Sequence, residues 1–267
     1  MIVLITGASG GLGTVLAKTL LAKGMAVYGT MRKPEGKENE YPFPMVAMEA
    51  TDTASVDQAI QRIIDKEGRI DVVVNCINDM IIGSTEEETV EEVESLYNTN
   101  VFGVLRVCKA VLPQMRKQSG GTIINMSSLG GLLAVPYMGA YTSAKFALEA
   151  LSEALYHEVK KDGISIVIMQ PVAMYMDRPA TGDHLHTVEN VANDSFTHKM
   201  VKVMARDTAA SKLTPEVVSE KISQVINAKK KPLRVPMDKA KAISVLKRVA
   251  PQALINKLIG GLLQDAG

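Results

Sequence analysis

The chain has 267 residues, 46% of them hydrophobic and 22% charged, which is enough for one α/β domain with a large core. The formal net charge of +1 gives no basic footprint for nucleic acid, and no Cys/His cluster has the spacing of metal ligands, so we expect neither partner. Cys76 and Cys108 lie in apolar segments, and the chain shows no signal peptide and no apolar run of membrane-spanning length; we expect reduced thiols in a cytoplasmic protein.

Strand-like runs alternate with helical runs over the first part of the chain. The strand runs are almost continuous Val and Ile, as in a parallel sheet that is covered on both faces. This alternation predicts a Rossmann-type doubly wound parallel sheet of about seven strands, with helices on both faces and ligands at the carboxyl ends of the strands. Strands are expected at 2–6, 26–31, 45–48, 70–75, 122–127 and 165–169, with a short edge strand at 232–237, and helices at 14–23, 55–66, 89–116 and 137–160.

The first strand leads into a glycine-rich turn at residues 6–13, Thr-Gly-Ala-Ser-Gly-Gly-Leu-Gly. Gly7, Gly11 and Gly13 allow the backbone to turn tightly and to approach a pyrophosphate at the N-terminus of the next helix. Because the turn lies between the first strand and the first helix of an α/β chain, it predicts dinucleotide binding.

The second strand ends where an NAD enzyme would carry an acidic residue for the ribose hydroxyls. Here the strand is followed by Arg32 and Lys33, which suit a 2′-phosphate. We therefore favour NADP(H) over NAD(H). The alternative is that both are solvated charges on a loop.

A serine, a tyrosine and a lysine are the main candidates for chemistry. An apolar run ends at Ser128, and Tyr141 and Lys145 lie four residues apart on one face of a predicted helix. We expect the ammonium group to lower the pKa of Tyr141 from about 10 toward the working pH, so that Tyr141 acts as general acid or base on a carbonyl or alcohol. Taken alone, the pair is more simply explained as surface decoration and Ser128 as the end of a strand.

Together these stretches resemble the short-chain dehydrogenase/reductase family in its single-domain form, strongly over residues 1–175 and loosely beyond. The family's Thr-Gly-x-x-x-Gly-x-Gly motif is met at 6–13 and its Tyr-x-x-x-Lys motif at 141–145. Its upstream serine is Ser128, and its conserved helix asparagine corresponds to Asn100. We therefore expect one domain over residues 1–267.

The resemblance implies a role for each matched residue. Tyr141 would be the acid/base, Lys145 would lower its pKa and bind the nicotinamide ribose, and Ser128 would hold the substrate oxygen. Asn100 would anchor a proton-relay water; without the resemblance, it is more simply a polar residue that kinks its helix. The expected cofactor contacts are Gly7, Ser9, Gly11, Leu12, Gly13, Arg32, Lys33, Glu49, Ala50, Asn75, Cys76, Tyr141, Lys145, Pro171, Val172 and Met174.

Three positions depart from the family pattern. The family's Asn-Asn-Ala-Gly is Asn75-Cys-Ile-Asn78 here, so the small residues beside adenosine are replaced. The acidic adenine contact is at best Glu49, and the threonine that binds the nicotinamide carboxamide is Met176. These changes predict altered cofactor binding, whereas the matched catalytic residues are all present.

Residues 177–214 lie where the family keeps its substrate lid. The segment begins polar and later carries Met200, Val203 and Met204, which suit an apolar ligand. Its histidines are more simply explained as solvated side chains than as metal ligands.

The C-terminal tail, residues 238–267, is basic and amphipathic. It is expected to lie on a membrane surface, to cover the substrate pocket, to pack on another subunit or to cover its own core, and the sequence leaves these alternatives open. The tail and the segment that follows Ser128 loosely resemble hydroxysteroid and retinol dehydrogenases.

The function expected from these observations is NADP(H)-dependent interconversion of a carbonyl and an alcohol on a bulky, apolar substrate, with Tyr141 as general acid/base. The alternative, from a different class, is a dinucleotide-binding sensor or scaffold with little turnover. The resemblance also implies a homodimer or homotetramer, formed through the apolar helices at 89–116 and 137–160.

Overall fold

The computed structural model describes residues 1–37, 39–175, 186–187, 191 and 195–264. Its main strands are β1 (Ile2–Thr6), β2 (Ala26–Met31), β3 (Met45–Ala47), β4 (Val72–Asn75), β6 (Gly121–Met126), β7 (Ile164–Gln170) and β9 (Arg234–Pro236). They form one parallel sheet of seven strands in the order β3-β2-β1-β4-β6-β7-β9. The predicted fold class is confirmed, and β9 is an edge strand, as the sequence indicated.

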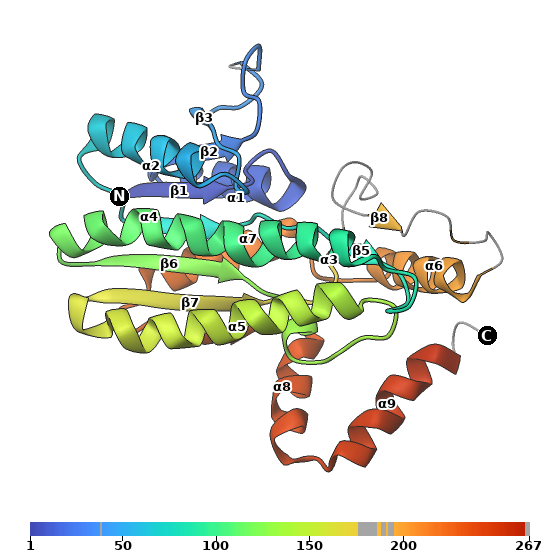
Figure 1. The fold of residues 1–267 in the computed structure, drawn as a ribbon. Coiled ribbons are helices and arrows are strands. Elements are labelled where there is room, and N and C mark those ends of the chain that lie inside the picture. Colours follow the sequence, from blue (N-terminus) through green and yellow to red (C-terminus); the bar gives the residue numbers. More distant parts are fainter. Residues whose placement is uncertain (38, 176–185, 188–190, 192–194, 265–267) are drawn as a thin grey trace.

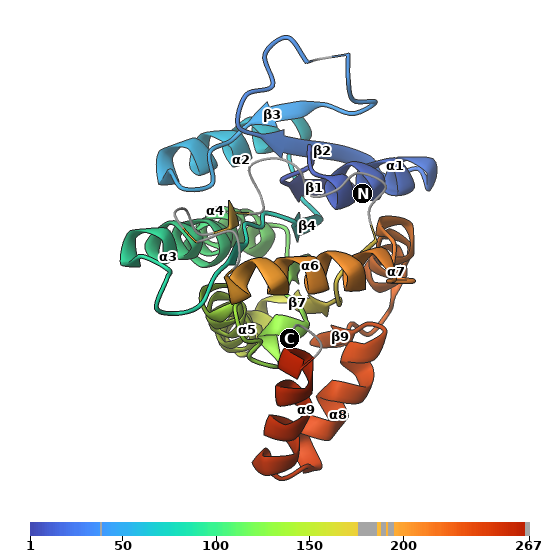
Figure 2. The same cartoon turned by 90° about the vertical axis from the view of Figure 1, so that its right-hand side faces the viewer.

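Helices cover both faces of this sheet (Figure 1). On one face, α1 (Gly11–Ala22) packs against α7 (Pro215–Asn227). On the other lie α2 (Thr53–Glu67), α4 (Val104–Lys117) and α5 (Gly139–Val159). The sheet is therefore buried between two layers, and the carboxyl ends of its strands lie toward the side of the molecule that faces the viewer in Figure 2.

Each face of the sheet has its own apolar core. Since neighbouring side chains of a strand point to opposite faces, β1 sends Val3 and Ile5 to the core under α1 and α7, and Ile2 and Leu4 to the core under α2, α4 and α5. All five residues of β1 are buried. This explains why the strands read as uninterrupted apolar runs.

The helical segment predicted at 89–116 is not one regular helix. It consists of α3 (Val90–Tyr97), a π-helical stretch over Asn98–Gly103, and α4. Thr89 and Glu92 form the expected capping box at its start. The π-helical stretch contains Asn100, and such stretches are frequent at functional sites.

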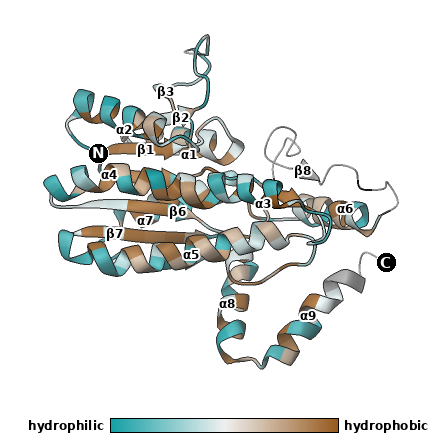
Figure 3. Ribbon diagram, viewed as in Figure 1, coloured by the Kyte–Doolittle hydropathy of each residue, from teal (hydrophilic) through white to brown (hydrophobic). Residues whose placement is uncertain are grey.

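The tail is also divided. Pro251 separates α8 (Lys239–Val249) from α9 (Gln252–Gln264), because a proline interrupts the backbone hydrogen bonds of a helix. The two helices project from the body as a pair (Figures 1 and 2), with polar and apolar residues interspersed along both (Figure 3). The Lys247 ammonium donates to the Leu132 carbonyl oxygen and lies 4.5 Å from the Phe146 ring centroid, so α8 contacts its own body; a membrane or subunit contact stays a prediction.

The lid is described only in part, and Met176 lies outside the described residues. In the described part, β8 (His186–Thr187) pairs in parallel with β5 (Ile81–Ile82), and α6 (Phe196–Ala209) follows. No helix in the described ranges combines the length and apolar character needed to cross a bilayer.

Candidate active site

Ser128 is held in place by the ends of two neighbouring strands. It follows β6 and precedes a 3-10 turn over Leu129–Gly131, where its Oγ accepts a hydrogen bond from the Gly130 N–H at 3.1 Å. The Leu129 N–H donates to the Pro171 carbonyl oxygen, just beyond β7, at 2.8 Å. The hydroxyl therefore sits at the carboxyl edge of the sheet, where the strand pattern predicted a ligand site.

Tyr141 and Lys145 lie on the first turns of α5, beside Ser128. The Tyr141 phenol is hydrogen-bonded to the Ser128 side chain. The Lys145 Nζ lies 5.5 Å from the centre of the Tyr141 ring and donates to the Met126 carbonyl oxygen, at the end of β6, at 3.0 Å. The structure thus brings together the three residues that the sequence proposed as the chemical centre.

The expected fall in the pKa of Tyr141 is wrong for this structure. Burial raises the pKa of the phenol above its ordinary value, and the hydrogen bond from Ser128 opposes that rise only in part. Burial also lowers the pKa of Lys145 to about 8, against the raising effects of Cys76 and Glu149. The tyrosine is therefore a neutral proton donor at neutral pH, beside an ammonium group that loses its proton readily.

The start of α5 is fixed by a loop that the sequence did not single out. Met138 offers no side-chain cap, but the Glu88 carboxylate accepts a hydrogen bond from the backbone of Ala140, an arrangement that suits the positive end of a helix. The neighbouring Glu87 accepts from the Thr197 hydroxyl of α6 at 2.6 Å. This loop therefore joins the helix that carries Tyr141 to the described part of the lid.

Asn100 lies in the π-helical stretch and is fully buried. Its side chain makes two hydrogen bonds with the backbone of Asp79: Oδ1 accepts from the N–H at 2.7 Å, and Nδ2 donates to the carbonyl oxygen at 2.8 Å. The side chain thus ties the segment after β4 to the helix, whereas its role in holding a water stays a prediction.

The glycine turn fits a diphosphate. Gly7 has a φ of 65°, which favours glycine, and a Cβ on Gly13 would lie 2.6 Å from the Gly7 carbonyl oxygen. Gly10, at the N-terminus of α1, provides no side-chain cap, so the first N–H groups of the helix are suited to an anion. Ser9 and Gly11 are exposed here, and Leu12 is half-buried.

The Asn75 side chain takes part in a buried hydrogen-bond network across three strands, and its contact with a cofactor stays a prediction. Thr6, Asn75 and Asn125 are in register across β1, β4 and β6. Thr6 Oγ1 donates to Asn75 Oδ1 at 3.2 Å, and Asn75 Nδ2 donates to Asn125 Oδ1 at 2.8 Å, while Asn125 Nδ2 donates to Ser152 Oγ at 2.9 Å. These buried bonds engage the Asn75 side chain inside the protein and lock together the strand ends that border the site.

The residues expected at the adenosine end flank the same edge. Arg32 and Lys33 are exposed after β2, whose Thr30 carbonyl oxygen accepts from the Ala8 N–H of the glycine turn at 3.0 Å. The Glu49 carboxylate is turned toward its own loop, where Oε1 accepts from the Thr51 hydroxyl at 2.8 Å and from the Thr51 N–H at 3.0 Å. Ala50 is buried.

The remaining expected contacts follow β4 and β7 in the chain. Pro171 is buried, and Val172 and Met174 pack against the apolar core under α1. Cys76 follows β4, and burial raises the pKa of its thiol to about 12, so it stays a neutral thiol.

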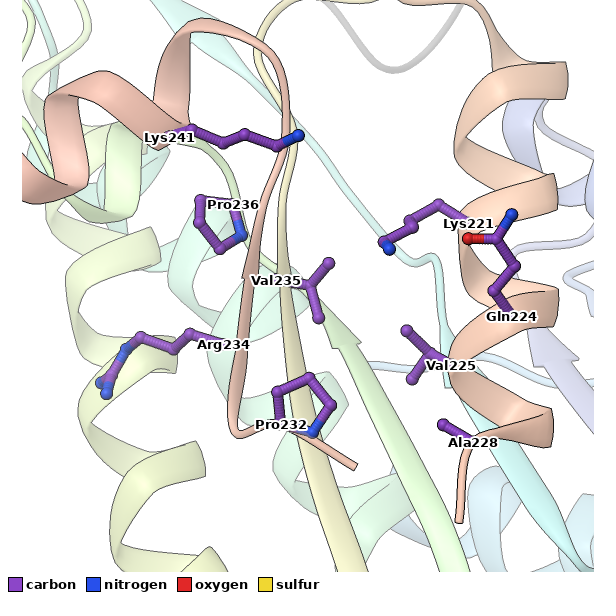
Figure 4. A pocket seen from close by; sticks show the side chains of 9 residues that line it. All are labelled: Lys221, Gln224, Val225, Ala228, Pro232, Arg234, Val235, Pro236 and Lys241. Atoms are coloured by element: carbon purple, nitrogen blue, oxygen red, sulfur yellow. The ribbon is translucent and has the colours of Figure 1, made fainter. Parts of the chain in front are cut away.

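A residue that the sequence analysis missed is Glu149, one helical turn after Lys145. Its carboxylate is buried and bonded to Arg234, which also borders a pocket of about 360 Å³ between α7 and β9. In Figure 4, the Arg234 side chain points away from α7, toward α5. The spacing of Glu149 from Lys145 was the available signal.

Comparison with known proteins agrees with this geometry. A family model described as short chain dehydrogenase matches residues 1–181. The chain belongs to this family. The sensor or scaffold alternative is not favoured by this membership in an oxidoreductase family.

Individual relatives add detail. The 3-ketodihydrosphingosine reductase of Bacteroides thetaiotaomicron is 48% identical to this short-chain dehydrogenase over 170 residues, which are 64% of this chain and 62% of that protein. A solved short-chain dehydrogenase from Streptomyces avermitilis has a TM-score of 0.82 at 29% identity, covering 96% of this chain and 94% of that one.

Two further solved structures share the fold. A short chain dehydrogenase from Burkholderia cenocepacia in complex with NADP has a TM-score of 0.78 at 22% identity, covering 96% of each chain. One from Burkholderia phymatum in complex with NAD has a TM-score of 0.77 at 20% identity, covering 96% of this chain and 94% of that one. Proteins of this fold thus bind either dinucleotide.

Proposed function

We propose that this short-chain dehydrogenase uses NADPH to reduce a ketone on a long, apolar substrate. The observation that carries the proposal is the buried Tyr141 phenol, hydrogen-bonded to Ser128 and adjacent to Lys145, at the sheet edge that also holds the glycine turn. A phenol that burial keeps protonated is suited to give a proton, and this favours the direction of reduction.

When bound, NADPH supplies a hydride that forms the new C–H bond at the carbonyl carbon. The Tyr141 O–H bond breaks as its proton passes to the carbonyl oxygen, and Ser128 donates a hydrogen bond to that oxygen. Lys145 lies near enough to stabilise the phenolate that remains, which takes a proton back from solvent. The alcohol and the oxidised cofactor are the products.

The substrate class is inferred from two observations. The segment after Ser128 carries half-buried apolar side chains at Leu132, Leu133, Val135 and Met138, and Met138 packs against the apolar cluster that contains Tyr141. The relative that is 48% identical is named for a ketone on a long alkyl chain. Ketodihydrosphingosine is therefore the first substrate to test, followed by other long-chain ketones.

NADP(H) is proposed over NAD(H) because two cations follow β2 where a 2′-phosphate would lie. Both Arg32 and Lys33 are exposed at this point. The sequence from the glycine turn to Lys33 contains no Asp or Glu that would repel a 2′-phosphate.

A homodimer or homotetramer is proposed because apolar side chains lie exposed on neighbouring helices of one face. Phe102 and Leu105 lie on the π-helical stretch and α4, and Leu151 lies on α5. Their burial against a second copy would remove apolar surface from water.

Turnover of NADPH with a panel of long-chain ketones tests the function. We expect Tyr141→Phe to lose about 100-fold or more in kcat while it still binds NADPH, because only the proton donor is removed. Tyr156→Phe, at the far end of the same helix, serves as the matched control and should keep wild-type turnover. Equal kcat for Tyr141→Phe and the control would overturn the mechanism.

A further inference from the structure

Glu149 is a buried carboxylate that the proposed reaction does not use. It lies four residues after Lys145 on α5, with an exposed fraction of 5%. Its Oε1 accepts from the Gln170 side-chain amide at 2.8 Å, and its Oε2 accepts from Arg234 Nε at 2.8 Å. An ionised carboxylate at this depth requires such partners.

The position of Glu149 connects it to each segment of the site. Gln170 ends β7 and immediately precedes Pro171, on which the turn after Ser128 rests. A Cβ added at Gly131, in that turn, would lie 3.0 Å from Glu149 Cγ and 2.5 Å from Ser127 Oγ. Glu149 therefore packs directly beneath the turn that presents Ser128.

The charges around Lys145 give Glu149 its electrostatic importance. Lys145 is 1% exposed and is influenced by Cys76, after β4, and by Glu149, on its own helix. The Cys76 thiol is neutral at physiological pH, whereas Glu149 carries a negative charge shared with Arg234. In a buried environment, a nearby anion favours the ammonium form of a lysine.

We infer that Glu149 is a positioning residue that keeps Lys145 as an ammonium group for the reaction, with Arg234 of β9 holding the carboxylate in place. Glu149 does not touch the substrate and acts through Lys145. Arg234 also bonds Glu153 at 2.7 Å, so the edge strand clamps the middle of α5 through two carboxylates.

This inference rests on the proposed function, and the pH dependence of kcat/KM for NADPH tests it, because that ratio reports groups of the protein before the cofactor binds. Since Lys145 has a pKa of about 8, we expect kcat/KM to fall above that pH in the wild type. Glu149→Gln removes the anion and should move this fall down by about one pH unit. Arg234→Gln removes the cation that faces Glu149 and should move the fall upward.

Shifts of the pH midpoint of kcat/KM in opposite directions for Glu149→Gln and Arg234→Gln indicate an electrostatic role. A purely structural role would lower the stability of both variants and leave this pH midpoint unchanged. Glu153→Gln is the matched control, since it removes the other, exposed carboxylate on Arg234, and its midpoint should stay at the wild-type value. Glu149→Asp keeps the charge and should also keep the midpoint, even with reduced turnover. Unmoved midpoints in Glu149→Gln and Arg234→Gln would overturn the inference.

A second readout does not depend on turnover. In protein labelled with 13C-lysine, the Lys145 Cε resonance, assigned with Lys145→Arg, follows the protonation of Nζ directly. Absence of NADPH turnover in the wild type would refute the proposed function, while the shift of this resonance between wild type and Glu149→Gln would still support or refute the role of Glu149.

Discussion

The Asn100 side chain satisfies both backbone groups of Asp79, at 2.7 Å and 2.8 Å, across a sequence separation of 21 residues. A single side-chain amide thus pairs with both the N–H and the carbonyl oxygen of Asp79. Asn100 lies in the π-helical stretch at Asn98–Gly103. Its two bonds to Asp79 hold the segment that follows β4 in its conformation.

We expect Asn100→Ala to lower the free energy of unfolding by about 2–4 kcal/mol, since it removes both side-chain hydrogen bonds to the Asp79 backbone. Urea denaturation measures this change. Asn227→Ala, which removes one side-chain bond to the Ser223 carbonyl oxygen near the end of α7, should cost about 1 kcal/mol. Equal urea midpoints for the two variants would show that the bonds to Asp79 contribute no more than one ordinary hydrogen bond.

Gly13→Ala should destabilise the protein although alanine is the better helix former. In an exposed helix the same change stabilises by about 1 kcal/mol, but here the new Cβ would lie 2.6 Å from the Gly7 carbonyl oxygen and 2.7 Å from Ala8 Cα, both backbone atoms. We expect a lower thermal midpoint and weaker NADPH binding, because the glycine turn must open to accommodate the new Cβ.

Gly260→Ala is the control for that prediction, since a Cβ at this position of α9 meets no neighbour within 4 Å outside its own helix among the residues that the structure describes. Its melting temperature should stay the same or rise. An unchanged melting temperature and NADPH affinity in Gly13→Ala would contradict the proposal that the tightly packed glycine turn binds the diphosphate.

Arg32→Ala tests the cofactor preference. A charge-assisted bond to a 2′-phosphate contributes about 1.5–3 kcal/mol, so the affinity for NADPH should fall about 10-fold or more while the affinity for NADH stays constant. Fluorescence titration with each cofactor gives the ratio. Lys37→Ala, in the same exposed loop, is the matched control and should leave it unchanged. A wild-type ratio in Arg32→Ala would assign the preference to other residues.

The stability of the protein should also report the burial of Lys145. Its pKa of about 8 lies below its ordinary value of 10.5, so the unfolded chain binds more protons at this position between these two pH values. Its contribution to the free energy of unfolding therefore rises with pH across this window. We expect the stability of the wild type relative to Lys145→Met to increase from pH 8 to 10.5, whereas the stability relative to Lys161→Met, at an exposed lysine, should stay flat.

The sequence predicted the features that depend on neighbouring residues. The strands were visible as Val/Ile runs, whereas the roles of Ser128, Tyr141 and Lys145 were proposed from their spacing together with the family resemblance. Burial of the phenol was not visible in that spacing, which is why the direction of its pKa was wrong. The π-helical stretch was missed because a π-helix and an α-helix have similar apolar patterns over six residues.

Contacts between residues that are far apart in the chain could not be predicted from local sequence patterns. Glu149 and Arg234 are 85 residues apart, and only the arrangement of β7 and β9 brings them together. The break in the tail at Pro251, in contrast, follows from a local rule and was overlooked.

The oligomeric state tests the apolar face formed by the π-helical stretch, α4 and α5. Phe102 is 47% exposed and Leu151 is 39% exposed, and a charge placed at both positions would be buried without a partner in a dimer. We therefore expect light scattering to give a dimer or tetramer for the wild type and a monomer for Phe102→Glu with Leu151→Glu. Val217→Glu replaces a similarly exposed residue, 49%, on the opposite face of the sheet, and should keep the wild-type mass. A monomeric wild type would refute the assembly, and dissociation by Val217→Glu alone would move the interface to α7.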